Sequence, residues 1–337
     1  MPIGCNVLLK FFSRLSEEDK QSFLRQLQKT YAGEEDGATL DAIVSARRDE
    51  GIVCPHCQNM EVVKFGTAGG KQRYRCQHCK RTFSDLSDSI LAYTKKDIRV
   101  WKEYAKCLLD RLPIRKSAQI CGIHRNTAFA WRHKLLDALA IMQRREKQLT
   151  GVVEADEMFI NISYKGTTPL DRPSRKRGEP ARKRGISREK VCITCAVDRR
   201  RRAYSRIATL GKVTIKALNR IMSRRISKLA ILCTDREKAY VRFARKNGIK
   251  LIQLESGKDK LGTYHINTVN SYHYRLRKFL MGFAGVSTKY LNNYLVWFNA
   301  MQNKALDALD MLKRTVKATV FTRWSNLSNR PAVPVVS

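Results

Sequence analysis

Two short cysteine pairs constrain the fold of this 337-residue chain more than any other feature. The first pair is Cys54 and Cys57, the second is Cys76 and Cys79, and eighteen residues separate the pairs. Each Cys-x-x-Cys turn can direct two thiolates at one metal ion, so two turns can close a tetrahedral four-thiolate site. A closed site has no open coordination position. We therefore expect a structural Zn²⁺ that folds a small ribbon and takes no part in catalysis.

Two histidines near the ribbon cysteines, and a further Cys-x-x-Cys pair, are not expected to bind the metal. His56 and His78 lie inside the two turns and are alternative ligands, but we expect them to be solvated or to face phosphate. A third Cys-x-x-Cys, formed by Cys192 and Cys195, lies in an apolar run that is typical of a buried strand. Because residues three apart in a strand face opposite sides, we predict two buried thiols there and no metal site.

The charge of the chain indicates the kind of partner it binds. It has 66 Lys and Arg against 30 Asp and Glu, a net charge of +36, while 43% hydrophobic residues are ordinary for a folded protein. A polyanion is the expected partner, and nucleic acid is favoured over an anionic membrane surface. No apolar run approaches the roughly 18 residues of a membrane span, and the first residues lack the features of a signal peptide. We therefore expect a cytoplasmic protein with reduced thiols.

The order of patterns along the chain predicts a multidomain α/β protein. A helical segment should come first, then a zinc ribbon, a helix-turn-helix domain, a mixed α/β domain with a basic insertion, and a C-terminal helix with a tail. The expected boundaries are 1–50, 51–90, 91–148, 149–304 with the insertion at 165–190, and 305–337.

Residues 116–132 have the pattern of a helix-turn-helix. Ala118 is small enough to let two helices approach, Gly122 turns the chain, and an apolar stripe follows on the second helix. Arg and Asn side chains make favourable contacts with guanine and adenine, so the second helix is a candidate for DNA recognition. The alternative is a helical hairpin that only links two domains. The candidate DNA-contacting residues are His124, Arg125, Asn126 and Arg132.

The region after residue 149 changes to strands interleaved with helices. Three strands followed by alternating helices and strands predict one mixed sheet with helices on both faces, an order compatible with a ribonuclease-H-like sheet. Asp156 lies within the first of these strands and Asp235 ends a later one. An ionised carboxylate in a core is unfavourable unless it is paired or binds a metal. The alternatives are a Mg²⁺ site, which two ions would occupy for phosphodiester chemistry, and a salt bridge to a nearby arginine.

A basic stretch separates the first two of these strands. Between residues 172 and 190 it has nine Lys and Arg against two acids, together with Gly and Pro. We interpret it as a DNA-contacting loop, with a merely solvated hairpin as the alternative. Its candidate contacts are Arg175, Lys176, Arg177, Arg182, Lys183 and Arg184.

Taken together, several segments resemble one family. They are the cysteine ribbon and the segments 153–160, 234–235, 265–277 and 285–295. The combination is similar to the ISXO-like, zinc-ribbon branch of insertion-sequence transposases, within the acidic-triad, ribonuclease-H-like superfamily. The resemblance implies that Asp156 and Asp235 are the first two Mg²⁺ ligands and that the third lies on the helix after Asn267.

The chain departs from the common triad at that third ligand. Its position is held by Asn270, where most of the superfamily has Glu, and Arg277 stands where Lys is frequent. An Asn oxygen can bind Mg²⁺ but removes one negative charge, and Arg is not a proton donor as Lys can be. Possible substitutes for the third ligand are Glu154, Glu157 and Glu255.

The resemblance implies a Mg²⁺-dependent transposase that acts on double-stranded DNA. It would bind terminal inverted repeats and target DNA as a homo-oligomer in the bacterial nucleoid, and would cleave and join strands with two metal ions. One alternative is a repressor of the same element with a weakened catalytic domain. Another is a structure-specific nuclease that cuts DNA and never joins ends.

Overall fold

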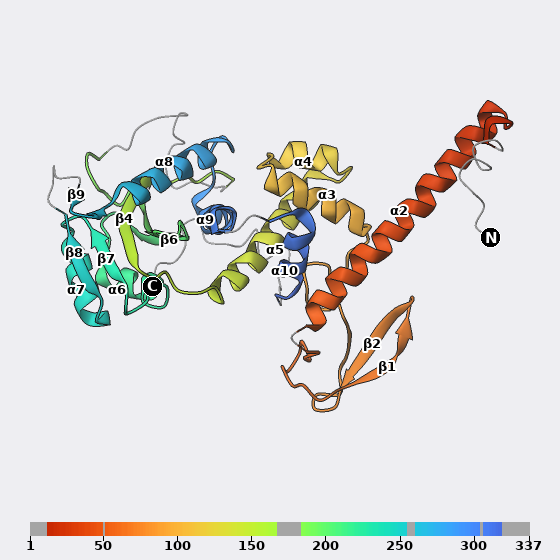
Figure 1. Cartoon of the computed structure of the whole chain (residues 1–337), viewed down its shortest axis with the longest axis horizontal. Helices are drawn as coiled ribbons and strands as arrows, with labels where there is room; N and C mark the ends of the chain where they lie inside the picture. The colour runs from red at the N-terminus through yellow and green to blue at the C-terminus, as the bar shows by residue number, and fades with distance from the viewer. Residues whose placement is uncertain (1–11, 50, 167–182, 255–259, 304–305, 319–337) are drawn as a thin grey trace.

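The computed structural model describes residues 12–49, 51–166, 183–254, 260–303 and 306–318. Figure 1 shows these parts arranged along an elongated molecule, with a sheet domain at one end, a group of helices in the middle, and a long helix with a small ribbon at the other. Among the described helices, none is long and apolar enough to cross a membrane.

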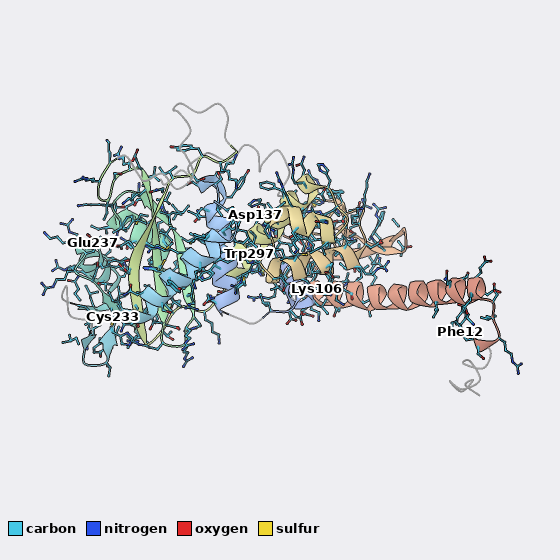
Figure 2. The ribbon with its side chains drawn as sticks, turned by 90° about the horizontal axis from the view of Figure 1, so that it is seen from above. Phe12, Lys106, Asp137, Cys233, Glu237 and Trp297 are labelled. Carbon is cyan, nitrogen blue, oxygen red and sulfur yellow. The ribbon has the colours of Figure 1, made fainter. Side chains whose placement is uncertain are left out.

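The long helix is α2, Glu17–Arg48. Ser16 begins it, since its hydroxyl accepts a hydrogen bond from the Asp19 backbone N–H at 3.2 Å. Both views show its first half projecting away from the rest of the molecule, with Phe12 at the far end (Figures 1 and 2). Its last turn is attached, because the Arg47 guanidinium donates to the Ser87 carbonyl at 2.7 Å and the Val316 carbonyl at 2.6 Å. The sequence indicated only a helical segment here, and the structure extends it to a single rod.

The ribbon follows α2. Its antiparallel sheet contains β1 (Val62–Ala68), β2 (Lys71–Cys76) and β3 (Thr82–Ser84). Gly69 and Gly70, both with positive φ, form the tight turn between the first two strands. The ribbon has a small core of its own, made by Cys54, Tyr74, Cys76 and Phe83.

Four helices form the middle of the molecule: α3 (Ile98–Leu109), α4 (Ile114–Ile120), α5 (Arg125–Arg144) and α10 (Ala308–Val316). Gly122 adopts φ 56° in the short turn between α4 and α5, a conformation that glycine adopts without strain. Trp101 of α3 stacks on Trp131 of α5 with ring centroids 3.7 Å apart.

The remaining domain is a five-stranded mixed sheet with the order β6-β5-β4-β7-β8. β4 is antiparallel to β5, which is antiparallel to β6, whereas β4, β7 and β8 are parallel. The helices α6 and α7 pack on one face, and α8 and α9 on the other (Figure 1). The bounds are β4 Val152–Asn161, β5 Lys190–Asp198, β6 Ala203–Leu210, α6 Ile215–Met222, β7 Ile231–Thr234, α7 Lys238–Asn247, β8 Lys250–Gln253, β9 Lys260–Leu261, β10 Tyr264–His265, α8 Asn267–Met281 and α9 Thr288–Asn303.

Helix α9 joins the middle helices to the sheet. One continuous apolar cluster includes residues of α3, α5 and α10 as well as the α8 face of the sheet, and α9 contributes Leu291, Trp297 and Phe298 to it. Figure 2 shows Trp297 between the two regions. We did not expect α9 from the sequence, because it is buried on nearly all sides and so lacks the alternation of an amphipathic helix.

Candidate functional site

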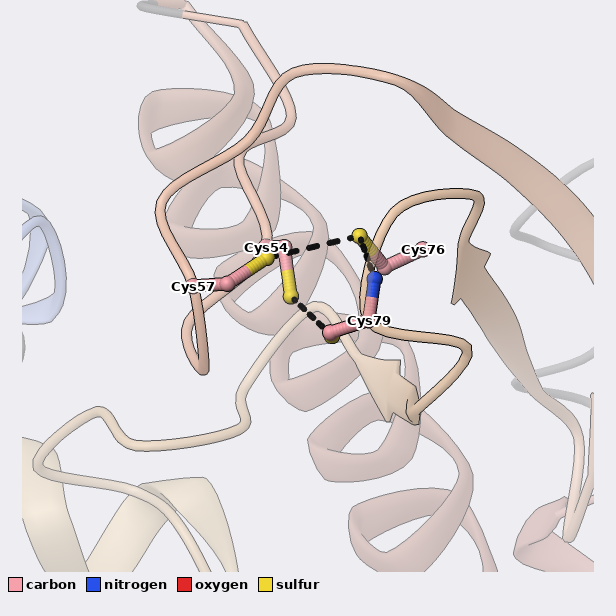
Figure 3. A group of neighbouring side chains, drawn as sticks. All are labelled: Cys54, Cys57, Cys76 and Cys79. Atoms are coloured by element: carbon pink, nitrogen blue, oxygen red, sulfur yellow. Dashed lines mark hydrogen bonds between the residues drawn. The ribbon is translucent and has the colours of Figure 1, made fainter.

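The four ribbon cysteines converge on one point. Their sulfur atoms all lie within 4.8 Å of one another, and the Cys54–Cys79 and Cys57–Cys76 sulfurs are 3.6 Å apart (Figure 3). The Cys79 backbone N–H points at the Cys76 Sγ from 3.5 Å, and hydrogen bonding of this kind lowers the pKa of the Cys76 thiol to about 7. This donor set fits a tetrahedral Zn²⁺. The expectation of a four-thiolate site is therefore confirmed.

Cys192 and Cys195 are separate from that site. Both are fully buried on β5, and they belong to the clusters on opposite faces of the sheet. Burial raises the pKa of the Cys192 thiol to about 12, so it stays protonated. The prediction of two buried thiols is confirmed.

A second possible metal site lies at one edge of the mixed sheet. β4 pairs with β7 in parallel, and Val153 is opposite Leu232 while Glu154 is opposite Cys233. Continued by two residues, this register would bring Asp156 opposite Asp235, the residue directly after β7. Burial is the main cause that raises the pKa of Asp156 to about 6, and the Asp235 carboxylate adds to it.

Helix α8 carries three polar residues, Asn270, His273 and Arg277, at spacings that put them on one side of the helix. Asn270 and Arg277 are exposed, and His273 between them is only 8% exposed. The His273 Nδ1 lies 3.8 Å from the Asp156 Oδ2. Burial and the nearby Arg277 lower the pKa of His273 to about 4, so its imidazole is neutral at neutral pH. His273 was not among the sequence candidates, although its position three residues after Asn270 puts both on one side of the helix.

Glu154 fixes the start of α8 over the sheet. One carboxylate oxygen accepts the backbone N–H groups of Thr268 at 2.7 Å and Val269 at 3.0 Å. The other is 2.7 Å from the Arg199 Nη1 and 3.2 Å from the His265 Nδ1. With both oxygens engaged in this way, Glu154 is a positioning residue for α8, and its geometry does not favour it as a substitute metal ligand.

The other two acids named as substitutes differ in position. Glu157 is on the opposite face of β4 from Asp156, because adjacent residues of a strand alternate. There burial raises its pKa to about 8 despite the neighbouring Tyr240 hydroxyl. Glu255 lies outside the described residues.

The four residues expected to contact DNA from the second helix divide into two groups. His124, Arg125 and Asn126 are exposed at the start of α5. The prediction for Arg132 was wrong, because its side chain is fully buried and cannot reach DNA. Its guanidinium donates to the Leu112 carbonyl at 2.6 Å and lies over the Trp297 ring at 5.2 Å. The sequence pattern gave its helical position correctly but could not show that α9 covers this side of α5.

A cleft opens beside the start of α5, between the middle helices and the sheet domain. It has a volume of about 750 Å³. Five cationic side chains and four aromatic rings line it, and the rings of Phe129 and Tyr290 have centroids 5.2 Å apart. The cationic side chains are Arg115, Arg125, Lys165, Lys289 and the buried Arg132.

The structure describes only part of the basic insertion. Arg175, Lys176, Arg177 and Arg182 lie outside the described residues, whereas Lys183 and Arg184 are exposed where the chain returns toward β5.

Comparison with known proteins bears on the class of the molecule. A family model for the ISXO2-like transposase domain matches residues 148–303, and one for a transposase zinc-ribbon domain matches residues 34–82. An uncharacterized protein in transposable element ISH50 of Halobacterium salinarum is 26% identical over 271 residues, covering 79% of this chain and 90% of the relative.

The solved structures that match are weaker relatives. A pre-cleavage Mos1 transpososome covers 60% of this chain and 78% of its own, with 13% identity and a TM-score of 0.22. A Mos1 transposase paired-end complex with left transposon end covers 63% and 81%, with 14% identity and a TM-score of 0.23. TM-scores this low do not support a statement about this chain.

The two family matches define the class: a transposase domain that follows a transposase zinc ribbon. Residues 148–303 are thus similar to an ISXO2-like transposase domain and residues 34–82 to a transposase zinc ribbon, and the sheet-edge acids and the ribbon cysteines lie within these matched regions.

Proposed function

We propose that this protein binds the terminal inverted repeats of an insertion sequence and catalyses the cleavage and transfer of DNA strands. The observation that carries the proposal is the electrostatic proximity of Asp156 on β4 to Asp235, which directly follows the neighbouring parallel strand β7, with the start of α8 held by Glu154. The strand order is also that expected of a ribonuclease-H-like sheet, in which the first strand is central.

The sheet-edge residues suit a hard divalent cation. Asp156, Asp235 and the Asn270 amide oxygen would hold two Mg²⁺ ions, since Mg²⁺ prefers oxygen ligands and keeps several waters. When bound, such a pair activates an attacking oxygen and stabilises the leaving one at a phosphodiester. The pKa of Asp156 is raised mainly by burial and additionally by the Asp235 carboxylate, and a bound cation would favour the ionised form of both acids. Arg277, exposed seven residues after Asn270, would contact a phosphate near the reacting bond.

The surface features support binding of double-stranded DNA. His124, Arg125 and Asn126 are accessible for recognition of a repeat, and the cleft beside them presents further cations to the backbone. Lys183 and Arg184, with the rest of the basic insertion, would extend that contact. We further propose that a homo-oligomer acts on the DNA, because two element ends must be held together with target DNA.

The direct test is Asp156→Ala, assayed on DNA that carries an element end with Mg²⁺ present. We expect nicking to be abolished and end binding to be retained. Asp97→Ala is the matched control, because Asp97 is an exposed acid at the start of α3 that makes no capping hydrogen bond. Unchanged nicking by Asp156→Ala would refute the assignment.

The same assay separates the alternatives. A repressor would bind the repeats specifically and would not cut them with Mg²⁺ or Mn²⁺. A structure-specific nuclease would cut branched DNA without joining ends, so joined products from the wild-type chain exclude both.

A further inference from the structure

His273 is a buried polar residue with an incomplete set of partners. It is 8% exposed, and its Nε2 has no hydrogen-bond partner among the described residues. Buried polar atoms of native proteins nearly always have a partner, so an unpaired nitrogen is consistent with a group that completes the site. The Asp156 carboxylate lies beside the ring.

The distance between these two side chains is informative. The Nδ1 of His273 is 3.8 Å from the Asp156 Oδ2, which is too long for a hydrogen bond. Two ligands of one ion, each bonded at about 2.1 Å, are roughly 3–4 Å apart. The Nδ1 atom is therefore the candidate ligand beside Asp156, and the distal Nε2 is left to a water or another polar group.

Asn270 is less well placed for tight binding. It is exposed, whereas His273, one turn further along α8, points into the buried side of the helix. Because Glu154 anchors the backbone N–H groups of Thr268 and Val269, the first turns of α8 are fixed over the sheet. From this fixed helix the His273 imidazole comes within 3.8 Å of the Asp156 carboxylate.

We propose that His273 is a direct protein ligand of the metal ion bound by Asp156, in place of the carboxylate that α8 lacks. This rests on the proposed function only in requiring a metal at the sheet edge. An imidazole donor is softer than a carboxylate, so the site should favour a first-row ion such as Mn²⁺ over Mg²⁺.

The test uses the full-length, zinc-loaded chain with Mn²⁺ as the probe. Pulsed electron paramagnetic resonance should detect coupling of Mn²⁺ to a ¹⁴N nucleus in the wild-type protein, a readout that needs no variant and no DNA. The zinc site has only sulfur ligands, so it contributes no such signal.

Three variants refine the assignment. His273→Gln should remove the nitrogen coupling and weaken Mn²⁺ binding at least tenfold, since even residues that only support a ligand change affinity by about 10–100-fold. Asn270→Ala should weaken it about twofold or less. His133→Gln is the matched control: His133 is also a fully buried histidine, but it lies in α5 beside Asn293, and its loss should leave the coupling in place.

The outcomes separate the two proposals. If Asp156→Ala leaves Mn²⁺ affinity unchanged, no metal binds at the sheet edge and the proposed function fails with this inference. If Asp156→Ala abolishes binding but the wild-type signal has no nitrogen coupling, only the assignment of His273 is overturned. His273→Glu gives an independent check, because an added carboxylate should shift the preference back toward Mg²⁺.

Discussion

The zinc ribbon and the acidic sheet edge are two candidate metal sites built in opposite ways. The ribbon takes all four ligands from residues 54–79, and their sulfurs converge within 4.8 Å. The sheet edge combines Asp156, Asp235 and α8, which are far apart in the sequence. Within the described residues, its ligand atoms do not gather as tightly as the cysteines do. Short spacing is therefore sufficient to specify the first site, while the second depends on strand register and on the placement of a helix.

This difference has an electrostatic consequence. Thiols are uncharged until they bind the ion, whereas neighbouring carboxylates are charged at neutral pH and repel each other. This repulsion adds to burial in raising the pKa of Asp156. The four cysteine sulfurs can therefore lie close together without a bound metal. For the sheet-edge carboxylates a larger separation lowers their mutual repulsion. The predictions below test this contrast, beginning with the largest expected effect.

Cys76→Ser should unfold the ribbon. Structural zinc contributes about 10–16 kcal/mol in small zinc-finger peptides, and the ribbon's core here has only four buried residues. The sheet domain should stay folded because its clusters are separate from that core. Zinc analysis and hydrogen exchange would measure both effects. Cys121→Ser, at a half-buried thiol outside the site, is the control, and a full equivalent of zinc in Cys76→Ser would contradict the four-thiolate assignment.

Glu154→Ala should destabilise the sheet domain by about 3 kcal/mol, because it leaves Arg199 without its partner and two backbone N–H groups unsatisfied. The measurement is urea unfolding. Glu237→Ala is the comparison, since Glu237 only caps α7 through the Ala239 N–H at 3.3 Å, and a cap contributes about 1 kcal/mol. Equal losses in the two variants would show that α8 is not anchored through Glu154.

Glu157→Gln should change how stability depends on pH. The folded-state pKa of Glu157, about 8, is above its ordinary value of 4.5, so the unfolded chain releases this proton first. The stability that Glu157 contributes is complete below about pH 4.5 and is lost as pH rises through about 8. Over that window one such group adds a slope of about 1.4 kcal/mol per pH unit.

Urea unfolding between pH 5 and 8, without added Mg²⁺, would measure this slope. Glu157→Gln should lose the pH dependence of the unfolding free energy that one such group contributes. It should keep the dependence below pH 6 that Asp156 contributes, because the pKa of Asp156 is also raised. An identical pH dependence in both proteins would mean that Glu157 is not buried as described.

Arg125→Ala should have the smallest effect, confined to DNA binding. The loss of one phosphate contact should reduce the salt slope of end binding by about 0.9, with unchanged thermal stability. Fluorescence anisotropy over a salt series would show it. Arg132→Lys is the converse variant: it should lower stability and leave the salt slope intact, because the buried guanidinium contacts Leu112 and Trp297. Unchanged stability together with a reduced salt slope in Arg132→Lys would support Arg132 as a DNA contact.

Features set by neighbouring residues were predictable from the sequence. The cysteine turns, the turn at Gly122 and the opposite faces of Cys192 and Cys195 all depend on spacings of a few residues. That β4 and β7 are neighbours, which brings Asp156 near Asp235, was anticipated only as a possibility, because the periodicity of a strand does not reveal its neighbour.

Features decided by packing could not be predicted in this way. The burial of Arg132 requires knowledge that α9 covers α5, and α9 has no amphipathic pattern of its own. Likewise the role of Glu154 depends on α8 beginning directly over β4. His273 became visible as a candidate only when its orphaned nitrogen and its distance from Asp156 were known.

The attachment of α10 to α2 has a consequence for synthesis on the ribosome. Arg47 at the end of α2 donates to the carbonyl of Val316, and the core around Ile43 and Trp101 includes Met311 and Leu312. A nascent chain can thus close its cysteine ribbon early, but it cannot complete the packing of α2 against the middle helices until α10 has left the exit tunnel. The final joining of the N-terminal modules to the rest of the protein is therefore delayed until translation has passed the transposase domain.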